Sequence, residues 1–345
     1  MASGGRASAC ITVPARAWLC LGLVLSACGQ PAPPPISIAL NPWVGYEYLH
    51  IAARQGFFAE EGVQVRLVEF GSINDVTRAF ERGQVEAFGC SPAELLRAVD
   101  QGTRQLKVFQ VLDFSDGADV VIARKPIADV AGLRGARVAI EHGTVTTFLL
   151  LRALESAGMT LDDVTLVSTD QLQMLDVFVA GKVDAVVSFP PVSSRVLATG
   201  QGNRVFSSER VPGEIVDMLA MDAALLQKRP DAAAAILRAF ERAIDFVEAN
   251  PAESYAAMAA RLGMKPEEVA ALLAKGIHIT PLVEQEAMFG AAGPLASSLR
   301  TNAEILRRAG ELSRAIDIDS LIEDEPLRRA LDASRSTKRA PRPEQ

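Results

Sequence analysis

An acidic run is the most unusual chemical feature of this 345-residue sequence. The segment Asp113-Phe114-Ser115-Asp116-Gly117-Ala118-Asp119 brings three carboxylates close together. Neighbouring carboxylates repel one another unless water or a cation lies between them. We therefore expect at least one of Asp113, Ser115 and Asp116 to contact a ligand, although Asp116-Gly117 also fits an ordinary turn. Asp217 could add negative charge to the same site.

A threonine-rich segment favours a ligand group of the opposite charge, an anion. Gly143-Thr144-Val145-Thr146-Thr147 follows a predicted strand and opens a predicted helix. The first turn of a helix has unpaired N–H groups and a partial positive charge, which favour an anion. The hydroxyls of Thr144, Thr146 and Thr147 could bind such a group, or one could only cap the helix. Both segments together predict a small zwitterionic or nitrogen-bearing organic solute.

Further polar and aromatic candidates stand at the ends of other predicted strands. They are Asn41, Trp43 and Tyr46 after the first strand, Ser72 before the second helix, and Cys90 and Ser91 before the third. Trp43 could form an apolar wall or hold a cation over its face. The alternative is a hydrophobic staple onto the next helix.

The sequence has none of the patterns that a catalytic or metal site requires. It contains no Gly-x-Ser-x-Gly elbow, phosphate loop or His-Glu-x-x-His motif. His50, His142 and His278 are far apart, and only His142 lies beside a predicted cleft loop. These histidines and Cys90 cannot form a zinc site. We predict no catalytic residue, no metal and no cofactor.

Short apolar strands alternate with amphipathic helices along most of the chain. Strands are predicted at 36–40, 63–70, 84–89, 106–112, 120–123, 137–140, 164–168, 185–188 and 215–220. Helices are predicted at 46–55, 73–81, 93–100, 146–157 and 172–180, and throughout the chain beyond 230. This alternation predicts helix-covered α/β sheets whose strands are parallel or mixed. The length favours two domains, which we assign as 36–119 with 212–332 (lobe 1) and 120–211 (lobe 2). The polar segment 333–345 is predicted to be a disordered tail.

Residues 1–27 are predicted to be a lipoprotein signal peptide rather than part of the fold. Arg6 and Arg16 accompany an apolar run, 17–25, that is too short to span a bilayer. Leu25-Ser26-Ala27-Cys28 resembles the bacterial lipobox, so we expect Cys28 to be lipidated and 28–35 to form a lipidated tether. The alternative is a secretory signal cleaved near Ala27.

The charge of the chain excludes one class of partner. The formal net charge is −7, and the first 27 residues carry no acid, so the remainder is more acidic still. An acidic body gains nothing from phosphate or anionic lipid surfaces, so no nucleic-acid partner is expected. Beyond Cys28 only Cys90 remains, so no disulfide is predicted within the folded body.

Three segments resemble one known family, the nitrate/sulfonate/taurine-type solute-binding proteins, which are related to pyrimidine-precursor-binding proteins. Arg54-Gln55-Gly56-Phe57-Phe58-Ala59-Glu60-Glu61-Gly62-Val63 is similar to the family's glycine and aromatic opening. Asp129-Val130-Ala131-Gly132-Leu133-Arg134-Gly135-Ala136-Arg137-Val138-Ala139 is similar to its "DLKGKKVA". Ala180-Gly181-Lys182-Val183-Asp184-Ala185 matches its "GKVDA", with a weaker copy at 83–87. The resemblance covers about 36–310.

The resemblance implies a two-lobed type II periplasmic-binding-protein fold that closes on its ligand. It implies a non-catalytic component of an ABC-type importer, anchored through Cys28 at the periplasmic face of the cell envelope and working with an inner-membrane permease. The implied ligand is a sulfonate, nitrate, pyrimidine precursor or amine-like solute. One departure concerns Ser188-Phe189-Pro190-Pro191-Val192, where Pro190 replaces an acid common in taurine- and sulfonate-type members. We therefore do not infer taurine as the ligand of this chain, although Phe189 is still expected to line the cleft.

Two other functions stay open. A lipoprotein that senses a ligand and reports to a membrane partner needs the same closing clamp, so the sequence does not separate it from an importer component. A pyrimidine-precursor synthase would need a cysteine-rich, histidine-bearing site. The chain offers only Cys90 for such a site.

Overall fold

The computed structural model describes residues 1–2, 4–5, 8, 33–290 and 292–339. The chain divides into a unit of residues 1–34 and a unit of residues 35–345. The predicted apolar signal run and Cys28 lie outside the described residues. Within the described residues, no helix is long and apolar enough to cross a membrane.

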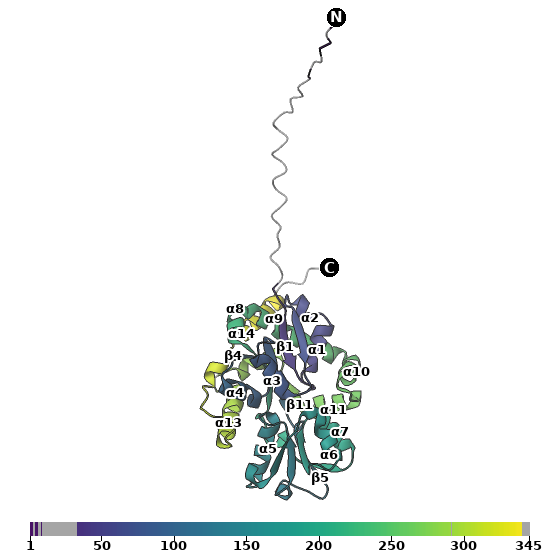
Figure 1. The fold of residues 1–345 in the computed structure, drawn as a ribbon, viewed down its shortest axis with the longest axis vertical. Coiled ribbons are helices and arrows are strands. Elements are labelled where there is room, and N and C mark those ends of the chain that lie inside the picture. Colours follow the sequence, from purple (N-terminus) through teal and green to yellow (C-terminus); the bar gives the residue numbers. More distant parts are fainter. Residues whose placement is uncertain (3, 6–7, 9–32, 291, 340–345) are drawn as a thin grey trace. The chain divides into compact units, whose positions relative to one another are not determined.

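The first sheet has six strands in the order β11-β4-β10-β3-β1-β2 (Figure 1). Its strands are β1 Ile36–Leu40, β2 Val65–Glu69, β3 Ala87–Cys90, β4 Leu106–Ser115, β10 Val216–Asp222 and β11 Ile277–Ile279. Strand β1 is parallel to β2 and β3, whereas β10 is antiparallel to β3 and β4, and β11 to β4. The sheet is therefore mixed. Strand β4 extends beyond its predicted end because Asp113 pairs with Asp217 of β10 and Ser115 with Ile277 of β11.

The second sheet has five strands in the order β7-β6-β8-β5-β9. They are β5 Val120–Arg124, β6 Arg137–Ile140, β7 Thr165–Ser168, β8 Ala185–Ser188 and β9 Gly202–Ser207. Strand β6 is parallel to β7 and β8, and β5 is antiparallel to β8 and β9. All five come from 120–211, and all strands of the first sheet come from the two flanking segments. On that support we propose the division into lobes 1 and 2 set out above.

Helices cover the two sheets (Figure 1). They are α1 Glu47–Arg54, α2 Phe57–Glu60, α3 Ile73–Glu81, α4 Pro92–Gln101, α5 Val145–Ser156, α6 Met174–Val179, α7 Val192–Ala198, α8 Ala223–Lys228, α9 Pro230–Ala249, α10 Pro251–Leu262, α11 Pro266–Lys275, α12 Leu282–Met288, α13 Pro294–Arg308 and α14 Glu325–Arg339. Helix α14 extends into the segment predicted to be disordered, so that prediction is wrong for residues 333–339. Its Leu327 and Ala330 are buried, which gives this helix an apolar face in the core.

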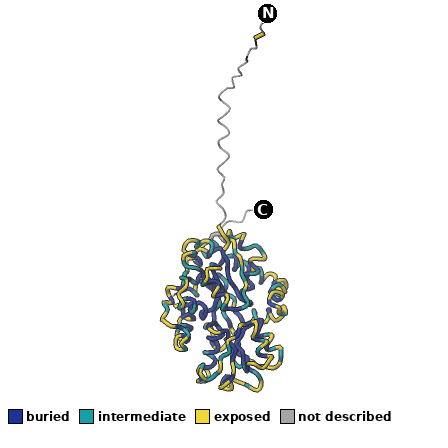
Figure 2. Tube along the Cα trace, viewed as in Figure 1, coloured by how far each residue is buried: buried dark blue, intermediate teal, exposed yellow. Residues whose placement is uncertain are grey.

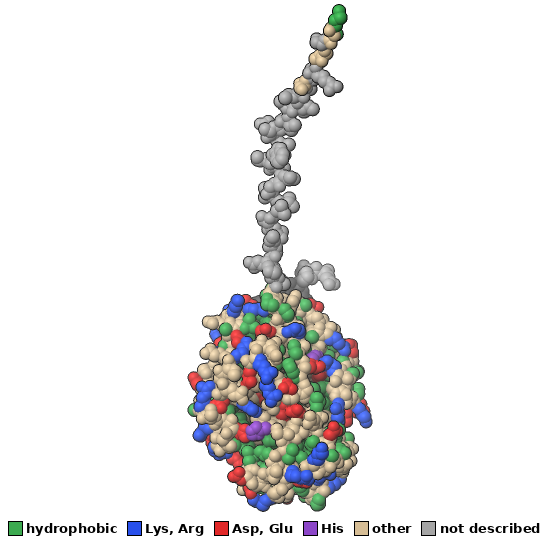
Figure 3. Space-filling model, viewed as in Figure 1, with side chains coloured by type: hydrophobic (Ala, Val, Ile, Leu, Met, Phe, Trp, Pro, Cys, Tyr) green, Lys and Arg blue, Asp and Glu red, His purple; other side chains and the backbone are tan. Residues whose placement is uncertain are grey.

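The buried residues follow the sheets and the inner faces of their helices (Figure 2). Phe80 of α3 and Phe88 of β3 are fully buried, with their ring centroids 4.7 Å apart. Phe148 of α5 and Phe178 of α6 are fully buried against the second sheet. Burial of such a side chain contributes about 1.5–3 kcal/mol. On the face shown in Figure 3, basic and acidic side chains are interspersed, so no single sign of charge dominates it.

Two short segments join the sheets, 116–119 and 208–215, and they are bonded to each other. The amide of Ser208 donates to the carbonyl of Asp119 at 2.9 Å. The Ser208 hydroxyl accepts from the Gly117 amide at 2.7 Å and lies 2.8 Å from the Ser115 hydroxyl. These contacts form the hinge between the sheets.

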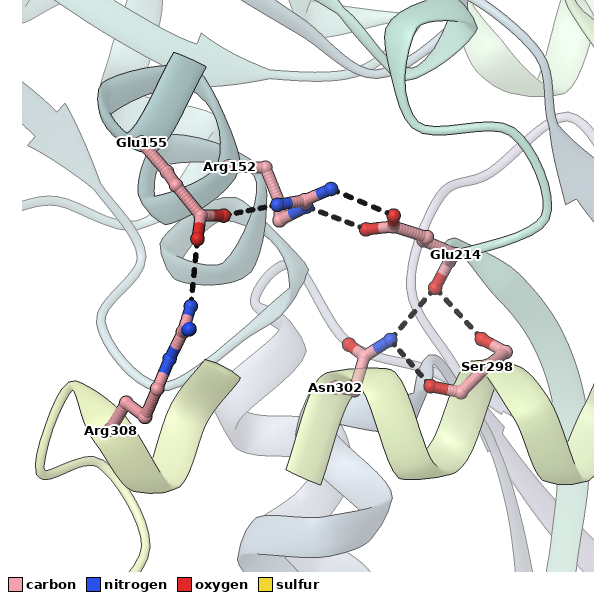
Figure 4. Close-up of polar contacts among 6 residues, drawn as sticks. All are labelled: Arg152, Glu155, Glu214, Ser298, Asn302 and Arg308. Carbon is pink, nitrogen blue, oxygen red and sulfur yellow. Dashed lines mark hydrogen bonds and ion pairs between the residues drawn. The ribbon is translucent and has the colours of Figure 1, made fainter. Parts of the chain in front are cut away.

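A polar network attaches the second hinge segment to helices α5 and α13 (Figure 4). Arg152 of α5 binds the Glu214 carboxylate through two bonds of 2.7 and 2.9 Å. The Glu214 carbonyl accepts from Ser298 and Asn302 of α13, each at 2.8 Å. Arg152 also pairs with Glu155, which bonds Arg308 at 2.8 Å. The network thus fixes one hinge segment to both lobes.

Arg152→Met should lower the free energy of unfolding by roughly 1–3 kcal/mol, because Glu214 loses its bidentate partner in a poorly hydrated position. Side-chain exposures of 24% for Arg152 and 18% for Glu214 place this pair largely out of water. Arg308→Gln is the matched control, since the pair of Arg308 with Glu155 is exposed and should be worth below about 1 kcal/mol. Urea unfolding of the two variants checks the difference. Equal losses would contradict it.

Candidate functional site

A pocket lies where strand ends of both sheets meet the hinge. Its lining comprises Asn41, Trp43, Tyr46, Ile73, Cys90, Ser91, Glu94, Asp119, Val145, Phe189, Ile215 and Asp217. Such crevices at the carboxyl ends of parallel strands are the usual ligand sites of α/β folds. The atom-free space is about 330 Å³, but only about 20 Å³ of it can hold the centre of a water molecule. The pocket is therefore narrow, and an organic solute requires its walls to move apart.

Aromatic rings from the two lobes meet across this pocket. Trp43 follows β1 and Phe189 follows β8, and their ring centroids are 5.6 Å apart with the planes at 88°. This edge-to-face arrangement is favourable for aromatic pairs. Trp43 therefore contacts the other lobe and is not merely a staple onto its own helix. Tyr46 is a third buried aromatic residue in the lining.

Carboxylates of lobe 1 lie beneath the rings. The Trp43 indole N–H donates to both oxygens of Asp113 at 3.2 Å, and the Tyr46 hydroxyl donates to Asp217 Oδ1 at 2.8 Å. Burial raises the pKa of Asp113 to about 8, with a further upward contribution from Asp119. Burial and the charges of Asp113 and Asp119 raise the pKa of Asp217 well above its ordinary value. These groups are thus protonated more readily than ordinary aspartates.

Two acids that the sequence prediction missed also line the pocket. Asp119 ends the first hinge segment and is 4% exposed, and burial raises its pKa to about 7. Glu94 accepts from the Ser91 amide at 2.7 Å and from the Val145 amide of lobe 2 at 2.6 Å. Both could have been found: Asp119 closes the acidic run, and Ser91 with Glu94 has the spacing of a capping box. Ile73, Val145 and Ile215 carried no comparable signal.

Cys90 lies in the lining as an inert group. Burial, with smaller contributions from Glu94 and Asp217, raises the pKa of its thiol well above the ordinary value. A reactive cysteine needs the opposite environment, one that stabilises the thiolate. Among the described residues, no group of His, Cys, Asp and Glu side chains could hold a metal ion.

The three predicted threonines do not line the pocket, because their hydroxyls bond to their own loop. Thr144 donates to the Glu141 carbonyl at 2.6 Å and accepts from the Thr146 amide at 3.3 Å. Thr146 accepts from the Glu141 amide at 3.0 Å, and Thr147 from the Gly143 amide at 2.8 Å. All three are buried. The capping alternative therefore describes Thr144, and the other two hydroxyls brace the turn before α5.

Ser72, Ser115 and Asp116 also lie outside the lining. Ser72 caps α3 and donates to Glu141 Oε1 at 2.9 Å across the lobes. Ser115 belongs to the hinge, as described above. The Asp116 side chain is exposed, and its amide donates to the Gly276 carbonyl at 2.8 Å, as in a turn. Of the sequence candidates, seven do line the pocket: Asn41, Trp43, Tyr46, Cys90, Ser91, Phe189 and Asp217.

A wider hollow continues from the pocket. It shares Asn41, Ile73 and Phe189 with the inner pocket and has about 620 Å³ of atom-free space. Its remaining lining is Pro42, Gly71, Gln171, Leu172, Pro191, Val192, Arg195, Arg261 and Leu262. The two arginines are thus at the outer hollow, and the acids are inside.

Comparison with known proteins shows the family of this chain. The model of the NMT1-like family matches residues 29–263. The chain belongs to the NMT1-like family. The taurine-binding periplasmic protein of Escherichia coli (strain K12) is 23% identical over 293 residues, which cover 79% of this chain and 88% of that protein. The 4-amino-5-hydroxymethyl-2-methylpyrimidine phosphate synthase of Aspergillus parasiticus is 26% identical over 235 residues, 63% of this chain and 68% of that protein.

The structure of this NMT1-like chain also has solved neighbours. The alkanesulfonate-binding protein SsuA from Xanthomonas axonopodis pv. citri bound to MOPS matches with a TM-score of 0.73 and 18% identity. The match covers 86% of this chain and all of that one. The predicted two-lobed periplasmic-binding-protein fold is confirmed, and so is the resemblance to the nitrate/sulfonate/taurine-type proteins.

Proposed function

We propose that the chain is the solute-binding component of an ABC-type importer and captures a small polar organic molecule in the pocket between its lobes. The pocket that both lobes build, with Trp43 against Phe189, carries this proposal. The relative named as a taurine-binding periplasmic protein and the structural neighbour named as an alkanesulfonate-binding protein support it. On the same support we place the chain at the periplasmic face of the envelope, with a permease as partner.

We further propose that Cys28 anchors the protein through a lipid. The lipobox-like sequence before it supports this part of the proposal. Fractionation of cells that express Cys28→Ser tests it. The variant should move from the membrane fraction to the soluble fraction of the envelope, and an unchanged distribution would exclude the anchor.

The proposal contains no catalytic step. The relative named as a phosphate synthase is the support for an enzyme alternative. Against it stands Cys90, whose buried thiol lies among acids and stays protonated, so it lacks the thiolate that a nucleophile or metal ligand needs.

Capture is tested by thermal unfolding of the purified chain in the presence of charged, zwitterionic and neutral small solutes. A bound solute should raise Tm, because it binds the folded state only; a concentration of about 100 times Kd adds about 2.7 kcal/mol. Phe189→Ala should weaken that rise, since it removes one wall of the pocket. Val283→Ala, a change at an exposed apolar residue on α12, is the control. No response to any class of solute would refute capture.

A further inference from the structure

The charged side chains that line the inner pocket all have the same sign. They are Glu94, Asp119 and Asp217, and Asp113 lies directly behind Trp43. The lining contains no lysine, arginine or histidine. In the part of the chain that the structure describes, none of the ion pairs involves these four acids. Ionisation of buried carboxylates is costly when no opposite charge lies beside them, and the lining supplies none.

Asp119 has few hydrogen-bond partners for a buried acid. Glu94 has two backbone N–H donors, Asp113 has the Trp43 indole, and Asp217 has the Tyr46 hydroxyl. In the part of the chain that the structure describes, the hydrogen-bond partner of the Asp119 carboxylate is the Ser115 hydroxyl, which also lies 2.8 Å from Ser208 Oγ. Asp119 is 4% exposed and lines the pocket. A buried carboxylate therefore faces the pocket without a cationic partner.

The helix ends that could bind an anion are already used by the protein itself. The Val145 amide at the start of α5 donates to Glu94, and so does the Ser91 amide before α4. The Asn74 amide in the first turn of α3 donates to Glu141 Oε1 at 2.8 Å. Helix N-termini are natural anion sites, and here carboxylates of the chain occupy all three. An anionic ligand at these three helix starts would therefore meet carboxylates of the chain in place of free amides.

We propose that the inner pocket binds an organic cation, with a protonated amine or amidinium nitrogen held between Asp119, Asp217 and the rings of Trp43, Tyr46 and Phe189. This inference rests on the proposed solute-binding function and names its substrate class. Aromatic faces attract such cations, most strongly when water is excluded. The raised pKa values of Asp113 and Asp119 agree with this, since a cation would compensate the charges that burial disfavours.

Matched probes that differ mainly in charge test the proposal. We would measure Tm and calorimetric Kd at pH 7.5 with choline, its neutral isostere 3,3-dimethylbutan-1-ol, benzylamine, benzyl alcohol, benzenesulfonate and taurine. A cation should bind more tightly than its neutral partner, and benzenesulfonate should not bind. Binding of a sulfonate without binding of any cation would overturn the cation proposal and leave solute capture intact. No binding of any probe would count against both.

Charge-neutralising variants locate the cation. Asp119→Asn and Asp217→Asn should each weaken cation binding about tenfold or more, which corresponds to about 1.4 kcal/mol. Asp245→Asn removes the same charge from an exposed position on α9 and should leave Kd within about twofold. We use two pocket variants so that the test remains valid if one of them misfolds. Unchanged cation affinity in a folded pocket variant would overturn the proposal.

Discussion

At pH 8, Asp217→Asn should be more stable than the unmodified chain by roughly 1–2 kcal/mol, although it removes a ligand-binding group. Asp113 and Asp217 face each other on β4 and β10, and both pKa values are raised by burial. Deprotonation of Asp113 near pH 8 leaves a buried negative charge beside Asp217, and an amide at position 217 would remove the repulsion between the two carboxylates. Thermal unfolding measures the gain, at about 2–4 °C per kcal/mol for chains of 150–250 residues.

The raised pKa values determine whether stability rises or falls with pH. An aspartate titrates near 3.9 in the unfolded chain, whereas Asp113 titrates at about 8 and Asp119 at about 7 in the fold. Between these values the native state binds more protons, so stability falls as pH rises from about 4 to about 8. The other titratable groups that face them are Tyr46, Cys90 and Glu94. Asp217→Asn should flatten that fall, and at pH 5 its advantage should vanish.

Asp245→Asn supplies the control for this prediction as well. It lies exposed on α9 and should follow the unmodified chain at every pH. A loss of stability in Asp217→Asn at pH 8 would mean that its carboxylate is favourably compensated in the free protein. That result would also remove one support of the cation proposal.

The sequence predicted the alternation of strands and helices well, because apolar periodicity records which residues face the core. It did not predict antiparallel pairing of β4 and β10, which depends on two segments that lie far apart in the chain. That pairing, together with the pairing of β11 to β4, extends β4 to Ser115 and decides the orientation of the acidic run. As a result Asp119 enters the pocket and Asp116 remains exposed.

The polar candidates show a different limit. Sequence gives the donors and acceptors near a helix start, but not which of them bind each other. The hydroxyls of Thr144, Thr146 and Thr147 form hydrogen bonds within their own turn. Glu94 reaches a helix start 51 residues further along the chain, a partner that only the assembled lobes provide. The start of that helix therefore binds the Glu94 carboxylate of the chain, and not the anionic ligand that we expected from the sequence.

Glu94→Ala should lower the free energy of unfolding by about 2–4 kcal/mol, because it removes a cap and leaves two buried amides without an acceptor. One of these amides, Val145, belongs to the other lobe. The contact between the two lobes should therefore lose more stability than the interior of either lobe. Urea unfolding measures the first effect, and the radius of gyration from small-angle scattering should rise as the lobes part. Glu268→Ala removes the same kind of capping bond from exposed α11 and should leave the radius of gyration unchanged. A radius unchanged in both variants would show that the contact between Glu94 and Val145 does not hold the lobes together.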